Sequence, residues 1–513
     1  MPIILVISLL APALALSTRG ETSPRINTTS GLIGGHRAPN RTSVAEFLGI
    51  KYGQAPTGGL RFAPPKRFIA PGTFYEASEW PGHLGQEAGA GLVSWGTYGA
   101  KRLPLAGPLL MTVSTGFTIP GPHSPFFSGQ YLADAEDVVV VTVNYRLGIF
   151  GFSGAPVLAQ NAALLDQRSA VEWVRDNIES FGGDPSRIVI FGQSAGGASV
   201  DYYSFTWTQD PIDYAESLWY NVSQTLGCGG SPNDDPDPEE AARILSCVRT
   251  ANVATILAAA AKVPALPTLA LPQATFHPTV DNVTVFADYE ARAAAGRFAR
   301  IPMLTGNNDF EAGWYKLSAY AAQINLTEAQ WDLYDERAFT CPSAYTAKYR
   351  VLYGVPTWRY RYFGDWGNLL LYNDTAGLGP RGSGAYHGSE IEMVFGTARD
   401  VSGLNNTCQE SATSRHIMGA WAAFARDPER GLSTYGWPLY DPVGKLFIPS
   451  TISPRTLLRG SLLLTSAWFC VYVGDSLVRL GYQNSPEPSF VAPSTYDSHC
   501  PTMNDPVPGR GAF

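Results

Sequence analysis

The segment from residue 137 to residue 200 constrains the fold of this chain more than any other. It begins with DVVVVTVNYR, a β-branched run with little polar alternation, which is typical of a strand buried on both faces. The following LLDQRSAVEWVRDNIESFGG predicts a helix that has Val171, Val174 and Ile178 near one face and is ended by two glycines. RIVIF then predicts a second strand. This β-α-β order predicts a right-handed crossover and a parallel sheet.

The stretch IVIFGQSAGGASV joins the second strand to small residues that suit a helix. Its Gly-x-Ser-x-Gly core places Ser194 after a strand and before a helix, at the edge where a parallel sheet binds ligands. Such a sharp turn needs small flanking residues, lifts the hydroxyl clear of the sheet and directs the N–H of Ala195 toward an oxyanion. Glycine is 52 of 513 residues, so the pentapeptide alone decides nothing, and its context is what indicates a nucleophile.

A serine nucleophile needs a base and an acid that orients the base, and in this fold both follow the serine. The stretch RIPMLTGNNDFEAG contains a short apolar strand followed by two acidic residues, Asp309 and Glu311. Either could leave the carboxyl end of that strand as the acid. The alternative is that both are surface charges.

Four histidines follow Ser194 in the chain: His277, His387, His416 and His499. The first precedes both acids, and the last adjoins Cys500 near the tail. His416 lies in SATSRHIMGAWAAFARDP, a helix-like segment whose apolar residues face a core, so we expect it to be packed or on a helix surface. His387 lies in GSGAYHGSEIEMVFG, flanked by glycines, and is our predicted base.

The N-terminal sequence MPIILVISLLAPALALSTRG predicts export. Its apolar run is followed by a small-x-small pattern and is too short to span a membrane, so we expect a signal peptide over residues 1–17 and no stable membrane anchor. Asn-x-Ser/Thr sequons fit a secreted protein and occur at Asn27, Asn40, Asn221, Asn282, Asn325, Asn373 and Asn405.

Composition narrows the function classes. The net charge of −8 has no basic stripe, which argues against a nucleic-acid partner. No Cys/His cluster has zinc spacing, so we expect no metal site. The six cysteines suit disulfides in an oxidising compartment, and the loop between Cys228 and Cys247 is rich in Pro, Asp and Gly. No boundary divides residues 18–513, so we expect a single domain.

Together these segments resemble the type-B carboxylesterase/lipase family, which includes the cholinesterases, and resemble its secreted fungal branch most. Blocks occur in family order between residues 43 and 500: SVAEFLGIKYGQAPTGGLRFAPP, VNYRLGIFGF, NAALLDQRSAVEWVRDNIESFGGDPSRIVIFGQSAGGASV, TGNNDFEAG, GAYHGSEIEMVFG and AWAAFARDPERGL. The resemblance implies an α/β-hydrolase fold, an α/β architecture with a mostly parallel central sheet flanked by helices.

The resemblance also implies the chemistry: a serine carboxylic-ester hydrolase that acts on a small-molecule ester through an acyl-enzyme, with no cofactor. Ser194 would be the nucleophile, Glu311 rather than Asp309 the acid and His387 the base. It further implies disulfides between Cys228 and Cys247 and between Cys341 and Cys500. The pairing of Cys408 and Cys470 stays open.

The chain departs from the family in four places. The oxyanion loop reads Ser114-Thr115-Gly116-Phe117, one residue short, with Thr115 and Gly116 where donating N–H groups belong. In GLVSWGTYGAKRLPLAG the first central strand and a family cysteine are not recognisable.

A third departure follows the predicted nucleophile, where a central strand is missing from SVDYYSFTWTQDPIDYAESLWYNVSQTLGC. The fourth is the insertion FIPSTISPRTLLRGSLLLTSAWFCVYVGD. We hypothesise a mis-spliced gene model, the alternative being a diverged homologue. The functional alternative is a catalytically impaired or non-enzymatic cholinesterase-like binding protein.

Overall fold

The computed structural model describes residues 23–79, 125–205, 214–230, 237–263, 275–375, 377–442 and 474–500, together with the backbone of 95–98 and 107–113. The expected signal peptide, the oxyanion residues Thr115 and Gly116, and Cys470 lie outside the described residues.

The described strands form three sheets. Their bounds are β1 Arg25–Thr28, β2 Gly31–Gly34, β3 His36–Arg37, β4 Ala45–Leu48, β5 Phe74–Glu76, β6 Trp95–Tyr98, β7 Gly107–Val113, β8 Val139–Val143, β9 Gly183–Gly192, β10 Met303–Asn308, β11 Thr357–Tyr362, β12 Leu477–Leu480 and β13 Ser489–Val491. A small sheet has the order β1-β2-β5, a six-stranded sheet the order β3-β4-β6-β8-β7-β9, and a four-stranded sheet the order β10-β11-β12-β13.

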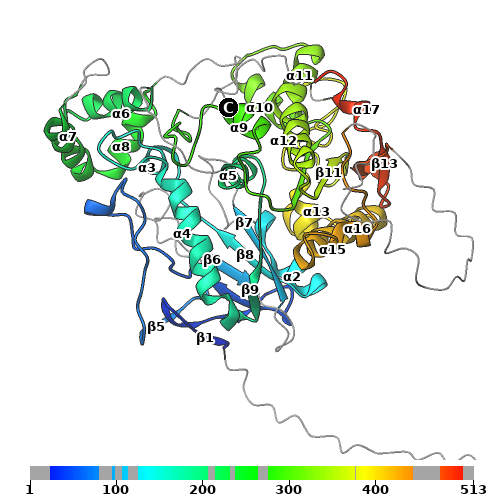
Figure 1. The fold of residues 1–513 in the computed structure, drawn as a ribbon, viewed down its shortest axis with the longest axis horizontal. Helices are drawn as coiled ribbons and strands as arrows, with labels where there is room; N and C mark the ends of the chain where they lie inside the picture. The colour runs from blue at the N-terminus through cyan, green and yellow to red at the C-terminus, as the bar shows by residue number, and fades with distance from the viewer. Residues whose placement is uncertain are drawn as a thin grey trace, which may run out of the picture.

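Helices connect and cover these strands (Figure 1). Their bounds are α2 Gln130–Glu136, α3 Gly148–Gly151, α4 Ala162–Asn177, α5 Ala195–Tyr203, α6 Tyr214–Thr225, α7 Pro238–Thr250, α8 Val253–Ala260, α9 Tyr289–Ala294, α10 Ala312–Ala321, α11 Glu328–Asp335, α12 Cys341–Leu352, α13 Ile391–Phe395, α14 Ala398–Ser402, α15 Cys408–Arg426, α16 Gly431–Tyr435 and α17 Ser494–Asp497. The short helical turns are η1 Gly58–Leu60, η2 Pro125–Phe127, η3 Ile178–Phe181, η4 Glu336–Thr340 and η6 Tyr482–Asn484, of which η4 is a π-helical turn.

Strand β8 lies between two helical layers. All five of its residues are buried, as the β-branched run predicts. Val139, Val141 and Val143 pack in the cluster that contains residues of α4, whereas Val140 packs in the cluster that contains residues of α2 and α15. Because successive side chains of a strand point to opposite faces, this alternation places helices on both faces of the six-stranded sheet.

Both strands of the predicted β-α-β unit are parallel to β7, which lies between them. The helix between them is α4, continued by η3 and ended at Gly182, whose φ of 82° is left-handed. The expectation that GLVSWGTYGAKRLPLAG contains no recognisable strand is wrong. Trp95–Tyr98 forms β6, which pairs antiparallel with β4 and β8. Its pairing partners, rather than a local pattern, define this short strand.

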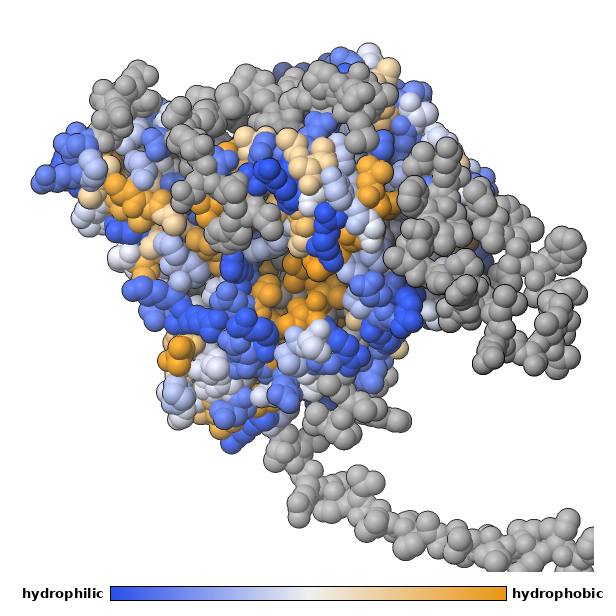
Figure 2. Space-filling model, viewed as in Figure 1, coloured by the Kyte–Doolittle hydropathy of each residue, from blue (hydrophilic) through white to orange (hydrophobic). Residues whose placement is uncertain are grey.

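The six-stranded and four-stranded sheets are separate, and the division falls where the sequence lacks a central strand. Strand β9 pairs with β7 alone and β10 with β11 alone among the described strands. Residues 188–191 of β9 are partly exposed, as expected for a strand that lacks a neighbour. Figure 2 shows apolar side chains in a hollow over the area where Figure 1 draws β7 to β9.

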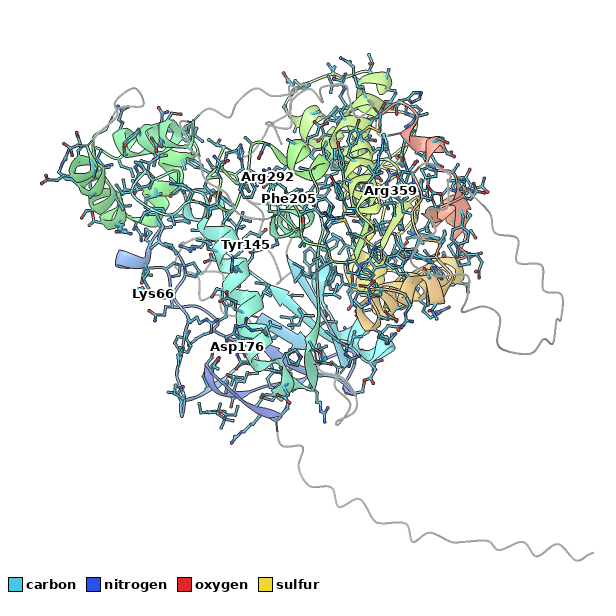
Figure 3. The ribbon with its side chains drawn as sticks, in the orientation of Figure 1. Lys66, Tyr145, Asp176, Phe205, Arg292 and Arg359 are labelled. Carbon is cyan, nitrogen blue, oxygen red and sulfur yellow. A yellow bond between two sulfur atoms is a disulfide. The ribbon has the colours of Figure 1, made fainter. Side chains whose placement is uncertain are left out.

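Helix α15 connects the two sheets. It packs against β7 and β9 in the first, and its Trp421 and Phe424 pack against Tyr360 and Trp358 of β11 in the second. A second link joins the end of α5 to the chain that enters β10, because Phe205 and Phe298 form an isolated antiparallel bridge. Figure 3 labels Phe205 near the centre of the molecule.

The structure brings together both expected cysteine pairs, Cys228 with Cys247 and Cys341 with Cys500. Cys408 is exposed and not in a disulfide. The second disulfide lies near Arg359 of β11, a fully buried residue labelled in Figure 3, whose guanidinium pairs with Asp497.

Within the described residues no single helix has the length and apolar composition to cross a membrane. Helices α7 and α8 have that length and apolar composition only when they are taken together, and the pair is bent by 116° at the break between the two helices.

Candidate active site

Ser194 stands in the sharp turn between β9 and α5. Its φ of 57° and ψ of −122° are unusual for a residue with a side chain, and the residue is exposed. A Cβ atom at Gly192 would lie 2.4 Å from the backbone carbon of Gly196, so glycine is required at position 192. This is the strained, closely packed turn expected for a Gly-x-Ser-x-Gly nucleophile.

Glu311 and His387 form a buried pair on the other side of the sheet division. Glu311 follows β10 and precedes α10, whereas His387 lies in the loop before α13. His387 Nδ1 lies 2.6 Å from Glu311 Oε2, and the two side chains are 11% and 5% exposed. Because a carboxylate only accepts, Nδ1 carries the hydrogen and Nε2 is left as the basic nitrogen.

The second oxygen of Glu311 is also held. Its Oε1 accepts a hydrogen bond from the backbone N–H of Asn308 at 2.7 Å. The next residue, Ala312, donates its N–H to Asp335 Oδ1 at 2.6 Å, so α10 begins in a fixed position. Both carboxylate oxygens of Glu311 are therefore fixed before any substrate binds.

Aromatic rings surround the imidazole. Tyr315 of α10 and Phe339 of the π-helical turn η4 lie 5.2 Å and 5.1 Å from the His387 ring, measured between ring centroids. These rings restrict the imidazole to the plane in which Nδ1 meets Glu311. Burial raises the pKa of Tyr315 well above its ordinary value, so its hydroxyl stays neutral.

The structure brings Ser194 near this pair without joining it. Among the described residues the Ser194 hydroxyl makes no hydrogen bond to His387. The neighbouring Gln193 approaches instead, with its Nε2 atom 3.4 Å from His387 Nε2. Hydrogen bonds of catalytic groups are often long in a protein without substrate, so this geometry leaves Ser194 a candidate nucleophile.

The competing candidates lie elsewhere. Asp309 Oδ1 accepts from Arg361 Nε at 2.9 Å and is 40% exposed, so this carboxylate is part of a surface ion pair. His416 accepts from Trp437 Nε1 at 3.2 Å in the packed surroundings expected for it. His277 lies 3.1 Å from the carbonyl of Pro278, and His499 is exposed.

Three buried carboxyl groups accompany the pair. Burial, followed by the charge of Glu311, raises the pKa of Asp335 to about 8 and that of Glu390 to about 7. Burial also raises the pKa of Glu392 to about 8, with smaller contributions from Glu390 and Glu410. Low solvation thus keeps these three carboxyl groups wholly or partly neutral near pH 7.

Of the predicted oxyanion residues, the structure describes Ala195. It is the first residue of α5, where an N–H has no acceptor within the helix and the helix dipole favours negative charge. Thr115 and Gly116 lie outside the described residues, so their part of the site remains a prediction.

Other candidate ligand sites are small or already occupied. Two cavities each have a volume of about 10 Å³, one bordered by Phe205 and Arg350 and the other by Arg146 and Asp166. Neither is lined by Ser194, Glu311 or His387. The ligand atoms of Glu336, Cys341 and Cys500 lie within 4.8 Å of one another, but the two sulfur atoms form a disulfide.

Sequence reasoning missed Asn308, Asp335, Gln193 and the aromatic residues around His387. Asn308 lies in the quoted TGNNDFEAG and could have been noted for its place at the end of the expected strand. Asp335 gave no signal, because its contact with the Ala312 N–H depends on how α11, which it ends, lies against α10.

Comparisons with known proteins identify the family of this chain. The model of the carboxylesterase family matches residues 22–73 and 101–211. The chain is 30% identical to chlorogenic acid esterase from Aspergillus niger over 451 residues, which cover 79% of this chain and 83% of the relative. It is 30% identical to secreted lipase 5 from Gibberella zeae over 515 residues, 84% of this chain and 92% of the relative.

Acetylcholinesterase from Electrophorus electricus is also similar, at 27% identity over 543 residues that cover 82% of this chain and 84% of the relative. The esterase and lipase relatives span most of the chain, and the segments matched by the family model include the Ser194 turn. Both relatives are fungal, and one is named a secreted lipase, which fits the branch that the motifs resemble. The chain therefore belongs to the type-B carboxylesterase family.

Proposed function

We propose that this chain is a secreted serine carboxylic-ester hydrolase with a single α/β-hydrolase domain over residues 18–513. The observation that carries the proposal is the buried contact of 2.6 Å between His387 Nδ1 and Glu311 Oε2. It is supported by the strained turn at Ser194 and by relatives named as esterases and a secreted lipase.

The proposed reaction proceeds through an acyl-enzyme. Ser194 Oγ attacks the ester carbonyl while its proton passes to His387 Nε2, and Glu311 stabilises the imidazolium that forms. The tetrahedral intermediate collapses, and His387 gives the proton to the departing alcohol. Water then attacks the acyl-enzyme, again losing its proton to His387, which returns that proton to Ser194 as the acid is released.

Stabilisation of the oxyanion completes the proposed reaction. Ala195 N–H would supply one donor, and the loop at Thr115 and Gly116 would supply the others. Loss of one such donor typically costs about 10²- to 10³-fold in kcat. The hydrolase proposed here is therefore expected to be slow if the β-branched Thr115 cannot direct its N–H inward.

We propose neutral, fairly apolar small-molecule esters as substrates, with no cofactor. Secretion and N-glycosylation complete the proposal, and they rest on the N-terminal sequence, the sequons and the two disulfides. The second candidate is a non-enzymatic binding protein on the same scaffold. It is favoured by the Gln193 amide at His387 Nε2, where a working triad needs the serine.

Covalent labelling separates the two candidates. A fluorophosphonate probe should label the wild-type protein, and the protein should hydrolyse p-nitrophenyl butyrate. Both signals should vanish in Ser194→Ala and persist in Ser433→Ala, a change at an exposed serine of α16. A folded wild-type protein that neither labels nor hydrolyses would favour the binding protein.

A further inference from the structure

Asn308 occupies the end of β10, three residues before Glu311. It is 1% exposed, so its polar atoms must find partners within the protein. Its backbone N–H donates to Glu311 Oε1 at 2.7 Å. This residue is therefore in direct contact with the acid of the His387–Glu311 pair.

The side-chain amide of Asn308 reaches the loop that carries the base. Its Nδ2 atom lies 2.7 Å from the carbonyl oxygen of Tyr386 and 2.5 Å from Glu390 Oε2, with Ser389 Oγ at 3.5 Å. The three partners flank His387 on both sides in the sequence. An amide nitrogen has two hydrogens, so the two short contacts use its full donor capacity.

These contacts fix the orientation of the amide. The carbonyl of Tyr386 can only accept, so the atom beside it must be the donating nitrogen. The remaining oxygen, Oδ1, is buried and has no hydrogen-bond partner among the described residues. Leaving an acceptor buried and unpaired costs stability, which is unusual unless the residue is kept for another reason.

We propose that Asn308 is the positioning residue of this site, fastening the turn that carries Glu311 to the loop that carries His387. The proposal rests on the ester-hydrolase function proposed above. Asn308 touches no reacting atom and acts through the 2.6 Å contact between His387 and Glu311. Misplacing such a pair by about 1 Å can cost about 10²-fold in rate.

Asn307 supplies a matched control. It is the preceding residue of the same strand, is 7% exposed, and donates to the carbonyl of Asn308 at 2.9 Å and to Thr340 Oγ1 at 3.4 Å. Within the described structure its side chain makes no hydrogen bond to residues 386–390. We expect Asn308→Ala to lower kcat by roughly 30- to 100-fold with KM changed less than about threefold. Asn307→Ala should leave kcat within about threefold.

A charge test separates positioning from simple destabilisation. Asn308→Asp replaces the donor by an acceptor next to Glu390, and only a protonated carboxyl can restore the link. The ratio of kcat/KM for Asn308→Asp to that for wild type should therefore rise by about tenfold as the pH falls from 8 to 6. The ratio is used because His387, Asp335 and Glu390 are present in both proteins, so that pH effects common to the two proteins cancel.

Exchange of donor and acceptor gives a second test. In Asn308→Asp with Glu390→Gln the new amide can donate to the new carboxylate, so kcat at pH 8 should recover by about tenfold over Asn308→Asp. Glu390→Gln alone keeps an acceptor for Asn308 and should retain most of the wild-type kcat. If Asn308→Ala lacks a cooperative unfolding transition, the two Asp-containing variants decide the question.

Two outcomes would overturn the proposal: equal kcat losses in Asn308→Ala and Asn307→Ala, or a pH-independent ratio without rescue by Glu390→Gln. Each is interpreted with Ser194-dependent fluorophosphonate labelling as the reference. If labelling depends on Ser194 while the Asn308 results fail, the positioning role is wrong and the hydrolase proposal stands. If wild type does not label, the hydrolase proposal itself fails.

Discussion

The six-stranded and four-stranded sheets contribute to the candidate site in different ways. In the four-stranded half, Glu311 and His387 are buried, in contact and held by backbone and aromatic neighbours. In the six-stranded half, Ser194 is exposed after a strand that is itself partly exposed and unpaired on one side within the described structure. The acid–base pair is thus organised within one half, while the nucleophile comes from the other.

This difference shows that the distance between Ser194 and His387 is the least constrained part of the candidate site. Hydrogen bonds within the four-stranded half fix the pair, but the distance between Ser194 and His387 depends on how the two halves pack through α15 and the Phe205–Phe298 bridge. A strand between β9 and β10 would fix that distance by backbone hydrogen bonds. The described structure has no strand there, so the distance depends on side-chain packing, which tolerates larger displacements.

The largest loss of kcat should come from a change to Glu311, in the four-stranded half. Glu311→Gln keeps the shape of the side chain but removes the charge that stabilises the imidazolium, so kcat should fall by about 10³- to 10⁴-fold. Steady-state hydrolysis of p-nitrophenyl butyrate measures this loss. Asp309→Asn is the matched control, because Asp309 is 40% exposed and pairs with Arg361 rather than with His387, and it should stay within about threefold of wild type. A larger loss of kcat in Asp309→Asn than in Glu311→Gln would contradict the assignment and would indicate that Asp309 is the acid.

The two disulfides are expected to stabilise the folded protein by different amounts. Cys341 and Cys500 are 159 residues apart and Cys228 and Cys247 only 19, so chain entropy assigns about 5 kcal/mol to the first and about 3 kcal/mol to the second. Replacing Cys341 and Cys500 by Ser should lower Tm more than replacing Cys228 and Cys247. It should also lower kcat, because Cys341 follows the turn that places Phe339 on His387. Differential scanning calorimetry of both double variants tests the order; equal Tm losses would contradict it.

A smaller effect is expected at Glu392, which is fully buried with neither oxygen hydrogen-bonded among the described residues. Burial raises its pKa from 4.5 to about 8, so the folded state keeps a proton that the unfolded state loses. Its contribution to stability is fully present below pH 4.5 and is lost as the pH rises through 8. Glu392→Gln should therefore leave Tm unchanged at pH 4.5 and raise it by roughly 2–5 °C at pH 8.5. If Glu392→Gln left Tm unchanged at pH 8.5, the Glu392 carboxylate would have to be solvated in the folded protein, which would contradict its burial.

Much of the fold could be predicted because its signals are local. The β-branched run of β8 predicts a buried strand, and the spacing of apolar residues in α4 predicts a helix. Strand β6 could not be predicted, because the four residues WGTY have no periodicity and are held by partners distant in sequence. The sequence predicts that a central strand is missing after the Ser194 turn, and among the described strands none joins β9 to β10.

The candidate site could be predicted only in part for the same reason. Sequence pattern alone left Asp309 as a competitor of Glu311, because the choice depends on which side of the turn each carboxylate occupies. Asn308 and Asp335 act across 78 and 23 residues of chain, distances over which no local pattern carries information. Family resemblance chose Glu311, and the structure pairs that residue with His387.

The claim that Ser194 and His387 from the two halves act as one catalytic unit has a direct test. We predict that Ser194→Ala and His387→Ala each lower kcat by about 10⁴- to 10⁶-fold and that the double variant is no more than about tenfold slower than either. Groups that share one proton transfer are lost together, so their effects do not multiply. Losses that multiply in the double variant, or a His387→Ala protein with nearly wild-type kcat, would show that the two halves do not form one active site.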